Sequence, residues 1–337
     1  VTIDETVPVT PAAPTLDPAS DTGTPGDGIT SDTTPTLTGT GTPGDEVTLY
    51  ADGTEVGTTT VQPDGTYSVT PDAPLGEGTT ELTVTTTNPS GNESAPSPAL
   101  SVTIDETAPA TPSQPTLDPA SDTGEVGDGI TSDPTPTLTG TGTPGETVTL
   151  YADGTEVGTA TVQPDGTYSV TPDAPLGEGT TELTVTTTDP SGNESDPSPA
   201  LSVTIDETAP VAPVAPTLDP ASDTGTPGDG ITSDTTPTLN GTGTPGETVT
   251  LYANGTEVGT ATVQPDGTYS VTPDADAPLS EGITSLTTTL TDASGNESAP
   301  SPGLSVAIDV TPPNAPTVDG PIEGDGVIRA DEQTDVS

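Results

Sequence analysis

The chain has 337 residues, of which 53 are Asp or Glu and only one, Arg329, is basic, so its formal net charge is −52. It contains no Cys, His, Lys, Trp, Phe or Met. Without His, Lys and Cys it lacks the usual general base near neutral pH, the Schiff-base amine and the thiol nucleophile. We therefore expect no enzyme activity and no catalytic residues. The acidity also excludes nucleic acid as a partner, and no stretch approaches the roughly 20 apolar residues of a membrane span.

The sequence repeats itself along its length. The motif V-T-I-D-E-T recurs around Ile3, Ile104 and Ile205 at intervals of 101 residues, and a related copy follows around Ile308 after a two-residue insertion. Repetition at a fixed period indicates a tandem array and not one large domain. We divide the chain into five parts. Residues 1–6 are the tail of a preceding repeat, and 7–107, 108–208 and 209–311 are repeats 1, 2 and 3. Residues 312–337 are the start of a divergent repeat. The chain is thus expected to be an internal part of something longer.

Alternating apolar residues predict strands, although 26% hydrophobic residues with this net charge would by composition alone indicate disorder. In repeat 1 the predicted strands lie near 15–16, 36–40, 47–51, 55–61, 66–70, 81–87 and 100–104, separated by Pro and Gly turn signals. Seven short strands in about 100 residues suit an immunoglobulin-like sandwich. We predict an all-β chain of tandem immunoglobulin-like β-sandwich domains of about seven strands each, arranged as an elongated rod.

The apolar positions of these strands predict the core of each sandwich. In repeat 1 the predicted core residues are Leu16, Ile29, Leu37, Val47, Leu49, Val56, Val61, Tyr67, Val69, Leu75, Leu82, Val84, Leu100, Val102 and Ile104. The two tyrosines of the repeat, Tyr50 and Tyr67, are interpreted as packing groups, with a ligand-stacking role as the alternative.

Carboxylates gather in the predicted loops. Asp21 and Asp27 lie between the first two strands, Asp105 follows the last strand, and Asn88 and Asn92 occupy the loop before it. Ca²⁺ prefers carboxylate, amide and carbonyl oxygens, which such loops supply. The alternative is that these are ordinary solvated turn aspartates on an acidic surface.

Sandwich topology sharpens the calcium hypothesis. The first loop and the end of the last strand share one pole, and the loop between the last two strands lies at the other. Asp21, Asp27 and Asp105 are therefore expected to face Asp189 and Asn193 of the next repeat, and bare carboxylates there would repel one another. The candidate calcium ligands are Asp105, Asp206, Asp309, Asp189, Asp292, Asn193, Asn296, Asp21, Asp27, Asp122, Asp128, Asp223, Asp229, Asp4 and Asn88.

Three motifs resemble the Ig-like extender repeats of giant bacterial RTX adhesins, which are exported by type I secretion: S-D-T-G…G-D-G-I-T, P-T-L-T-G-T…V-T-L-Y, and D-x-S-G-N-E-S followed by V-T-I-D-E-T-A-P. The resemblance covers essentially the whole chain. It implies Ig-like sandwiches in series, Ca²⁺ at the linkers and a role in holding a distal ligand-binding tip away from the cell. By position it implies linker calcium ligands at Asp105, Asp206 and Asp309, with Asp189 and Asp292 as partners, whereas Asn88 departs from the aspartate.

The leading hypothesis is accordingly an extracellular extender at the bacterial cell surface, stiffened by calcium at its linkers and serving adhesion or biofilm formation. Its expected partners are neighbouring repeats of the same polypeptide and calcium, in a monomeric rod. The alternative is a repeated binding module that contacts carbohydrate, ice or a host surface directly, although no exposed aromatic platform favours a sugar site.

Overall fold

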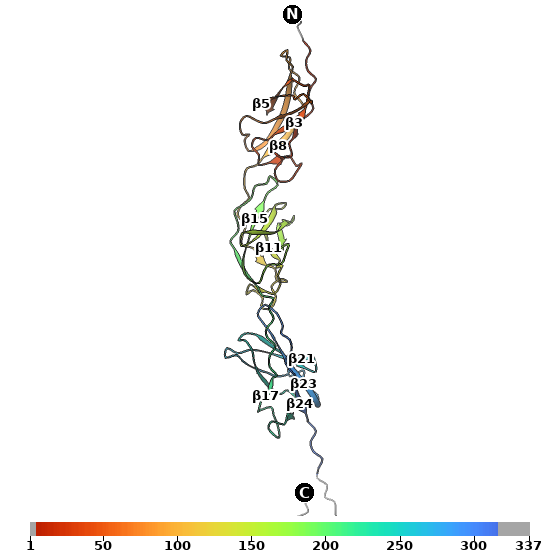
Figure 1. Cartoon of the computed structure of the whole chain (residues 1–337), viewed down its shortest axis with the longest axis vertical. Coiled ribbons are helices and arrows are strands. Elements are labelled where there is room, and N and C mark those ends of the chain that lie inside the picture. The colour runs from red at the N-terminus through yellow and green to blue at the C-terminus, as the bar shows by residue number, and fades with distance from the viewer. Residues whose placement is uncertain (1–4, 316–337) are drawn as a thin grey trace, which may run out of the picture. The chain divides into compact units, whose positions relative to one another are not determined.

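The computed structural model describes residues 5–315, which form three successive all-β repeats without a helix (Figure 1). Each repeat contains eight strands. In repeat 1 they are β1 Thr15–Leu16, β2 Ile29–Thr30, β3 Leu37–Thr40, β4 Glu46–Ala51, β5 Thr54–Thr60, β6 Thr66–Val69, β7 Gly78–Thr87 and β8 Leu100–Ile104.

Repeats 2 and 3 copy this order of strands. In repeat 2 they are β9 Thr116–Leu117, β10 Ile130–Thr131, β11 Leu138–Thr141, β12 Thr147–Ala152, β13 Thr155–Thr161, β14 Thr167–Val170, β15 Gly179–Thr188 and β16 Leu201–Ile205. In repeat 3 they are β17 Thr217–Leu218, β18 Ile231–Thr232, β19 Leu239–Thr242, β20 Thr248–Ala253, β21 Thr256–Thr262, β22 Thr268–Val271, β23 Gly282–Thr291 and β24 Leu304–Ile308.

Two sheets make up each repeat. In repeat 1 a three-stranded sheet has the order β1-β3-β6 and a five-stranded sheet has the order β2-β8-β7-β4-β5. All pairs are antiparallel except β2 and β8, which are parallel. Consecutive strands β3 and β4 lie in different sheets, as do β5 and β6, so the chain crosses repeatedly between the two layers. This arrangement confirms the predicted all-β, immunoglobulin-like fold.

The β4–β5 hairpin shows how local sequence sets local structure. Its two-residue turn is Asp52-Gly53, and both residues have positive φ, 50° and 79°. A turn with two positive-φ residues matches the right-handed twist of the strands that it joins, and Asp-Gly is a favoured pair for it. The Asp52 carboxylate also accepts a hydrogen bond of 3.1 Å from the Glu81 backbone N–H, which ties the turn to β7.

Each repeat has one strand more than the seven predicted by position, namely β2. This strand has only two residues, Ile29 and Thr30, which pair with Thr103 and Ile104 of β8. A strand of two residues is too short to show an alternating pattern, and its partner lies far away in the sequence. The consequence is important for the site: β1 belongs to one sheet and β2 to the other, so the loop between them is anchored beside the end of β8.

The core prediction fails at Ile29, which is only partly buried and lies outside the core cluster. Its neighbour Thr30 is fully buried instead, with 0% exposure. Parallel pairing sets Thr30 beside the inward-facing Ile104 and therefore turns Ile29 away from the core. The Thr30 hydroxyl donates a hydrogen bond of 2.6 Å to the Ser20 carbonyl oxygen, which compensates for burying a polar group.

The remaining predicted core residues lie in or against the core of repeat 1. Ten are buried, four others pack partly buried against them, and Ala51 joins the cluster although it was not predicted. The partly buried four are Leu16, Val56, Leu75 and Leu100. The same cluster recurs in repeats 2 and 3. Tyr67 is buried as a packing group, but Tyr50 is only half-buried and donates its hydroxyl to Glu93 at 3.1 Å.

The described residues divide into two compact units. One holds repeats 1 and 2 together with the short segment Asp292–Glu297, and the other holds the rest of repeat 3. Within residues 5–315 no helix is long and apolar enough to cross a membrane. Asp4 lies outside the described residues. The predicted divergent repeat at 312–337 also lies outside them, apart from residues 312–315.

Candidate functional site at the repeat junction

The end of β8 and the loop between β1 and β2 lie together at one pole of repeat 1. The backbone N–H of Asp105, just after β8, donates to the Thr30 carbonyl oxygen at 2.9 Å. The Asp105 Oδ1 atom accepts the Thr107 N–H at 3.0 Å. The missed strand β2 thus sets Asp105 beside the loop that carries Asp21 and Asp27.

A tight turn of repeat 2 meets this pole. In it, Asp189 Oδ1 accepts the Asn193 backbone N–H at 2.9 Å and Asp189 Oδ2 accepts the Asn193 side-chain amide at 3.0 Å. The Gly192 N–H donates to the Asp189 carbonyl oxygen at 3.1 Å. These bonds hold the turn in one shape, with Pro190 and Ser191 at its tip. We call residues 189–193 the Ser-Gly-Asn turn, and use the same name for its copies.

Four hydrogen bonds join the Ser-Gly-Asn turn to repeat 1. The Ser191 hydroxyl donates to Asp105 Oδ2 at 2.7 Å, and the Asn193 side-chain amide donates to the Asp105 carbonyl oxygen at 2.8 Å. In the opposite direction, the Thr22 hydroxyl donates to the Ser191 carbonyl oxygen at 2.6 Å. The Thr24 N–H donates to the Pro190 carbonyl oxygen at 2.8 Å. Both backbone and side chains therefore specify the contact.

Gly23 is required at this contact for two reasons. Its φ is +72°, a conformation that other residues rarely adopt. A Cβ placed on it would also overlap the Pro190 carbonyl oxygen and lie 2.7 Å from the Gly192 nitrogen. The turn of repeat 2 therefore approaches the backbone of repeat 1 more closely than any side chain would permit.

The same contact recurs between repeat 2 and the segment Asp292–Glu297, which groups with the first unit. The Thr123 hydroxyl donates to the Ser294 carbonyl oxygen at 2.6 Å, and the Glu125 N–H donates to the Ala293 carbonyl oxygen at 2.9 Å. Asp206 accepts the Ser294 hydroxyl at 3.1 Å through Oδ2, and its carbonyl oxygen accepts the Asn296 amide at 2.7 Å. Two independent copies of one geometry define a repeated site.

The structure brings some of the candidate ligands together and leaves others apart. Asp105, Asp189 and Asn193 meet at the first contact, and Asp206, Asp292 and Asn296 meet at the second. Asn88 occupies the position of Asp189 in the equivalent turn of repeat 1, and its side-chain amide donates to the Thr6 carbonyl oxygen at 2.8 Å. Asp309 accepts the Thr311 N–H at 3.0 Å.

Asp27, Asp128 and Asp229 lie away from the Ser-Gly-Asn turns. All three are exposed, and each accepts the backbone N–H of the isoleucine two residues later, at 2.8–2.9 Å. Their geometry is that of aspartates that close a turn of their own loop.

Asp21, Asp122 and Asp223 show a different recurring feature. The Oδ2 atom of each accepts a glycine N–H at 2.5–2.6 Å. The other oxygen, Oδ1, is buried and without a hydrogen-bond partner in all three repeats. An unpaired buried carboxylate oxygen is energetically costly, and this cost is repeated in every repeat.

Sequence reasoning missed the residues that carry most of the junction contact, namely Thr22, Gly23 and Ser191 with their copies. These residues carry no carboxylate, so a pattern of metal-ligating side chains does not include them. The signal was present in the motifs S-D-T-G and S-G-N, which all three repeats carry.

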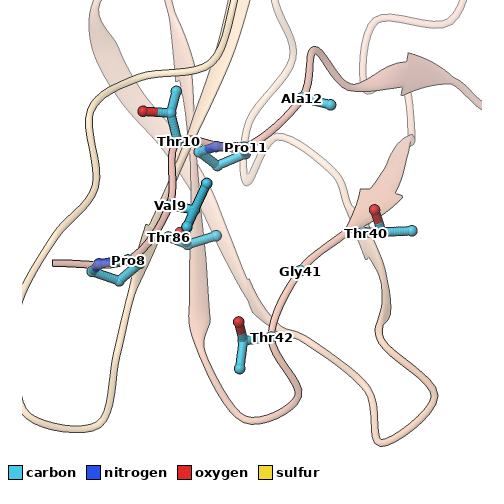
Figure 2. A pocket seen from close by; sticks show the side chains of 9 residues that line it. All are labelled: Pro8, Val9, Thr10, Pro11, Ala12, Thr40, Gly41, Thr42 and Thr86. Atoms are coloured by element: carbon cyan, nitrogen blue, oxygen red, sulfur yellow. The ribbon is translucent and has the colours of Figure 1, made fainter. Parts of the chain in front are cut away.

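Two small hollows of the surface lie beside proline-containing segments of repeats 1 and 2. Figure 2 shows one of about 200 Å³, between Pro8–Ala12 and the segment Thr40–Thr42, with Thr86 beside it. Repeat 2 has a counterpart of about 250 Å³ near Ala110–Ser113. Both are smaller than the roughly 300–1,000 Å³ usual for small-molecule sites. Prolines, hydroxyls and small side chains line them, and no aromatic ring offers a face for stacking a sugar.

Two packed sheets with this strand order define the class of immunoglobulin-like β-sandwich arrays. Residues 6–106, 108–207 and 209–310 each match the family of bacterial Ig-like domains. The chain belongs to that family. Such a tandem Ig-like array is a structural and not an enzymatic protein.

Among solved structures, the chain is similar to three from adhesins or adhesion proteins. It shares 22% identity with one from a study of host cell surface retention of a 1.5-MDa bacterial ice-binding adhesin, over 90% of this chain and 98% of that one, with a TM-score of 0.31. A Ca²⁺-stabilized adhesin of an ice-binding Antarctic bacterium gives 24% identity over 89% and 74%, with a TM-score of 0.34. A tetra-tandem repeat in the extending region of a large adhesion protein gives 23% over 89% and 74%, with a TM-score of 0.28. No curated protein matches the chain.

Proposed function

We propose that the chain is a structural extender of a bacterial cell-surface adhesin, in which Ca²⁺ bound at the junctions stiffens successive repeats. In this role it projects a distal ligand-binding region away from the cell for adhesion or biofilm formation. Membership of the bacterial Ig-like family supports a structural role. The repeated junction supports a function that depends on how neighbouring repeats are joined.

The observation that carries the metal proposal is the pairing of carboxylates across a junction, in a chain with a single basic side chain. Asp105 of repeat 1 and Asp189 of repeat 2 both contact Asn193. The only basic side chain of the sequence is Arg329. Protein side chains therefore leave the charge at the junction uncompensated, and a divalent cation would remove the repulsion.

The donor atoms fit a weakly held calcium ion. They are carboxylate, amide and backbone oxygens, which suit a hard cation, and nitrogen or sulfur ligands for zinc are lacking. Among residues 5–315, however, no group of three or more acidic side chains is close enough to form a metal cluster. Fewer charged ligands mean lower affinity, and sites of this kind in extracellular modules bind with dissociation constants of about 10⁻⁴–10⁻³ M.

A second location is available within each repeat, at the buried Oδ1 of Asp21 and its copies. This oxygen is unpaired in repeat 3 as well as in repeats 1 and 2, so it belongs to the loop itself. The junction is the leading site because it explains why a metal would stiffen the connection between repeats.

In our proposal, calcium dependence also explains how the chain is exported before it folds. A strongly acidic chain repels itself and stays loose where calcium is scarce, as in the cytoplasm, and this suits secretion by a type I pathway. Millimolar calcium outside the cell then favours the folded, extracellular form by mass action.

Calorimetric titration of the full chain with Ca²⁺ tests the site. We expect Asp105→Asn to remove one binding event, because the substitution removes a charged ligand and keeps the shape. Asp27→Asn serves as the matched control, since Asp27 is exposed and caps its own turn. If Asp21→Asn removes binding and Asp105→Asn does not, the metal sits in the loop and not at the junction.

Small-angle scattering tests the mechanical role. With Ca²⁺ present we expect a larger maximum dimension and a higher melting temperature than in a chelator. Equal dimensions and equal melting temperatures in the two conditions would rule out the role of calcium and leave the family assignment intact.

A further inference from the structure

We propose that Asn254, in the turn of the β20–β21 hairpin of repeat 3, is a site of spontaneous deamidation, in which the backbone nitrogen of Gly255 displaces the side-chain amide as ammonia. Water is the co-reactant, and the products are aspartate and isoaspartate. Aspartate is already present at this position in repeats 1 and 2, as Asp52 and Asp153. The reaction takes place within repeat 3 and involves neither the junction nor the proposed calcium.

Asn-Gly is the pair of residues in which this reaction meets the least steric hindrance, because glycine has no side chain beside its own nitrogen. The sequence contains two such pairs, Asn240-Gly241 and Asn254-Gly255, and both lie in repeat 3. Every other asparagine precedes proline, glutamate or alanine. Both pairs are followed by threonine, so a difference in their reactivity arises mainly from the structure around them.

The hairpin pair is exposed, and its reacting atoms are available. Asn254 and Gly255 are both exposed and have positive φ, 52° and 83°. A Cβ placed on Gly255 would meet nothing within 4 Å, so there is room for a ring to form beside it. Among residues 5–315, neither the Gly255 N–H nor the Asn254 side-chain nitrogen donates a hydrogen bond. The attacking nitrogen and the leaving group are therefore both unrestrained by the fold.

The neighbouring strand β23 stabilises the charge that develops during the reaction. The Ser285 N–H donates to Asn254 Oδ1 at 3.0 Å. When the Gly255 nitrogen loses its proton to solvent and adds to Cγ of Asn254, negative charge develops on Oδ1, and a donor already in place stabilises it. The bond between Cγ and Nδ2 then breaks, and ammonia leaves with a proton from water. The product is a succinimide ring that contains the Gly255 nitrogen.

Hydrolysis of the ring adds one water molecule and gives two products. Cleavage between the nitrogen and Cγ gives aspartate, whereas cleavage between the nitrogen and the main-chain carbonyl carbon gives isoaspartate. Aspartate fits the hairpin, because in repeats 1 and 2 its Oδ1 accepts the equivalent N–H, from Glu81 and Glu182, at 3.1 Å. Isoaspartate adds a methylene group to the backbone of a two-residue turn, and we expect it to loosen the hairpin.

The pair Asn240-Gly241 is a comparison within the same repeat. Asn240 is half-buried in β19, where its side-chain amide donates to Asp219 Oδ2 at 2.7 Å and its Oδ1 accepts the Ser270 hydroxyl at 2.7 Å. Gly241 lies within the same strand, in register with Tyr269 of β22. Ring closure at Asn240 would therefore require the side-chain bonds and the local strand pairing to break.

Mass spectrometry of the full chain tests the proposal. The chain is incubated at mildly alkaline pH and then cleaved after glutamate at acidic pH, which places Asn254 in the peptide 248–257 and Asn240 in the peptide 208–247. We expect the change of amide to acid to appear at least about tenfold faster at Asn254, because hydrogen bonds and strand pairing resist the reaction at Asn240. Equal rates at the two sites, or faster conversion of Asn240, would overturn the proposal.

Unfolding separates the effect of the structure from that of the sequence. In urea the two sites should convert at similar rates, since both have the sequence Asn-Gly-Thr. A difference in urea as large as that in the native chain would assign the preference to local sequence and contradict the structural argument.

Glycine variants test the attacking nitrogen. Gly255→Ala should slow conversion of Asn254 at least about tenfold, because a methyl group hinders the nitrogen. The matched control Gly53→Ala alters the same turn of repeat 1, which has no amide to lose, and should leave the rate at Asn254 unchanged. An unchanged rate in Gly255→Ala would overturn the proposed route through the succinimide.

The variant Asn254→Asp tests whether the hairpin accommodates the product. Its melting temperature should equal that of the native chain, because Asp52 and Asp153 occupy the same turn with the same hydrogen bond. Isoaspartate in the incubated chain, detected with an isoaspartate-specific methyltransferase, should be accompanied by faster amide exchange in the hairpin. A lower melting temperature of Asn254→Asp would overturn the claim that deamidation to aspartate leaves the fold intact.

Discussion

The loop between the first two strands has the same sequence at residues 20–32 of repeat 1 and 222–234 of repeat 3, but its surroundings differ. In repeat 1 the loop is covered by a turn of repeat 2, which accepts two hydrogen bonds from the loop and donates two to Asp105. In repeat 3 the same loop keeps its internal bonds and remains exposed at Thr224. The comparison shows that the loop folds by itself and that its contact with a neighbour is a separate, additional interaction.

The largest effect is expected from the core, which both repeats share. Leu49→Ala should destabilise repeat 1 by about 2–5 kcal/mol, because the Leu49 side chain has 0% exposure and its truncation leaves a cavity in the close-packed core. Urea unfolding measures this, and Leu251→Ala in repeat 3 should cost a similar amount. The control is Val9→Ala, since Val9 is 89% exposed and should change stability little. Unequal costs for the two leucines would mean that neighbours contribute to the core.

The glycine of the loop gives the sharpest contrast between the two copies. Gly23→Ala should cost about 1–3 kcal/mol more than Gly225→Ala, because both carry positive-φ strain but only Gly23 lies against another turn. Amide exchange of Thr24, whose N–H donates to Pro190, is the local measurement. It should be slow in the native chain and accelerate in Gly23→Ala, and it should stay slow in the control Gly26→Ala. Fast exchange of Thr24 in the native chain would contradict the contact.

A smaller effect is expected from one hydroxyl at the junction. Ser191→Ala removes the 2.7 Å bond to Asp105 and should weaken the contact by about 1 kcal/mol. Exchange of Thr24 should quicken by about fivefold to tenfold, with Ser68→Ala, on an exposed face, as the comparison. No change in exchange would show that the backbone bonds alone hold the turn.

The smallest expected effect is a pH dependence that is present in all three repeats. Burial raises the pKa of Tyr67, Tyr168 and Tyr269 above the ordinary value of 10.0. The unfolded chain therefore ionises first, so this part of the stability is complete below pH 10 and is lost as the pH rises through the folded pKa values. Tyrosinate absorbance should show a delayed component in the native chain that is absent in urea. Tyr67→Phe should reduce that component, and an unchanged curve would contradict the assignment.

Much of the fold could be predicted because its signals are local. Alternation marks β7 and β8, and Asp-Gly turns mark the β4–β5 hairpin, so seven of the eight strands of a repeat were found near their observed bounds. The strand β2 was not found, since two residues carry no period. The wrong prediction of Ile29 as a core residue, where Thr30 is buried instead, has the same cause. Only the pairing of β2 with β8 determines which of the two side chains faces inward.

The candidate site, too, could be predicted only in part from the sequence. The sequence by itself determined that acidic, glycine-rich loops recur with the repeat, since composition and period can be read along the chain. Sandwich topology also predicted that Asp105 faces Asn193 of the next repeat. Only the tertiary structure decided that Ser191 donates to Asp105, and that Thr22 and Gly23 complete the contact. The physical reason is that these residues lie far apart in the sequence and are brought together by the crossing of β1 and β2 between two sheets.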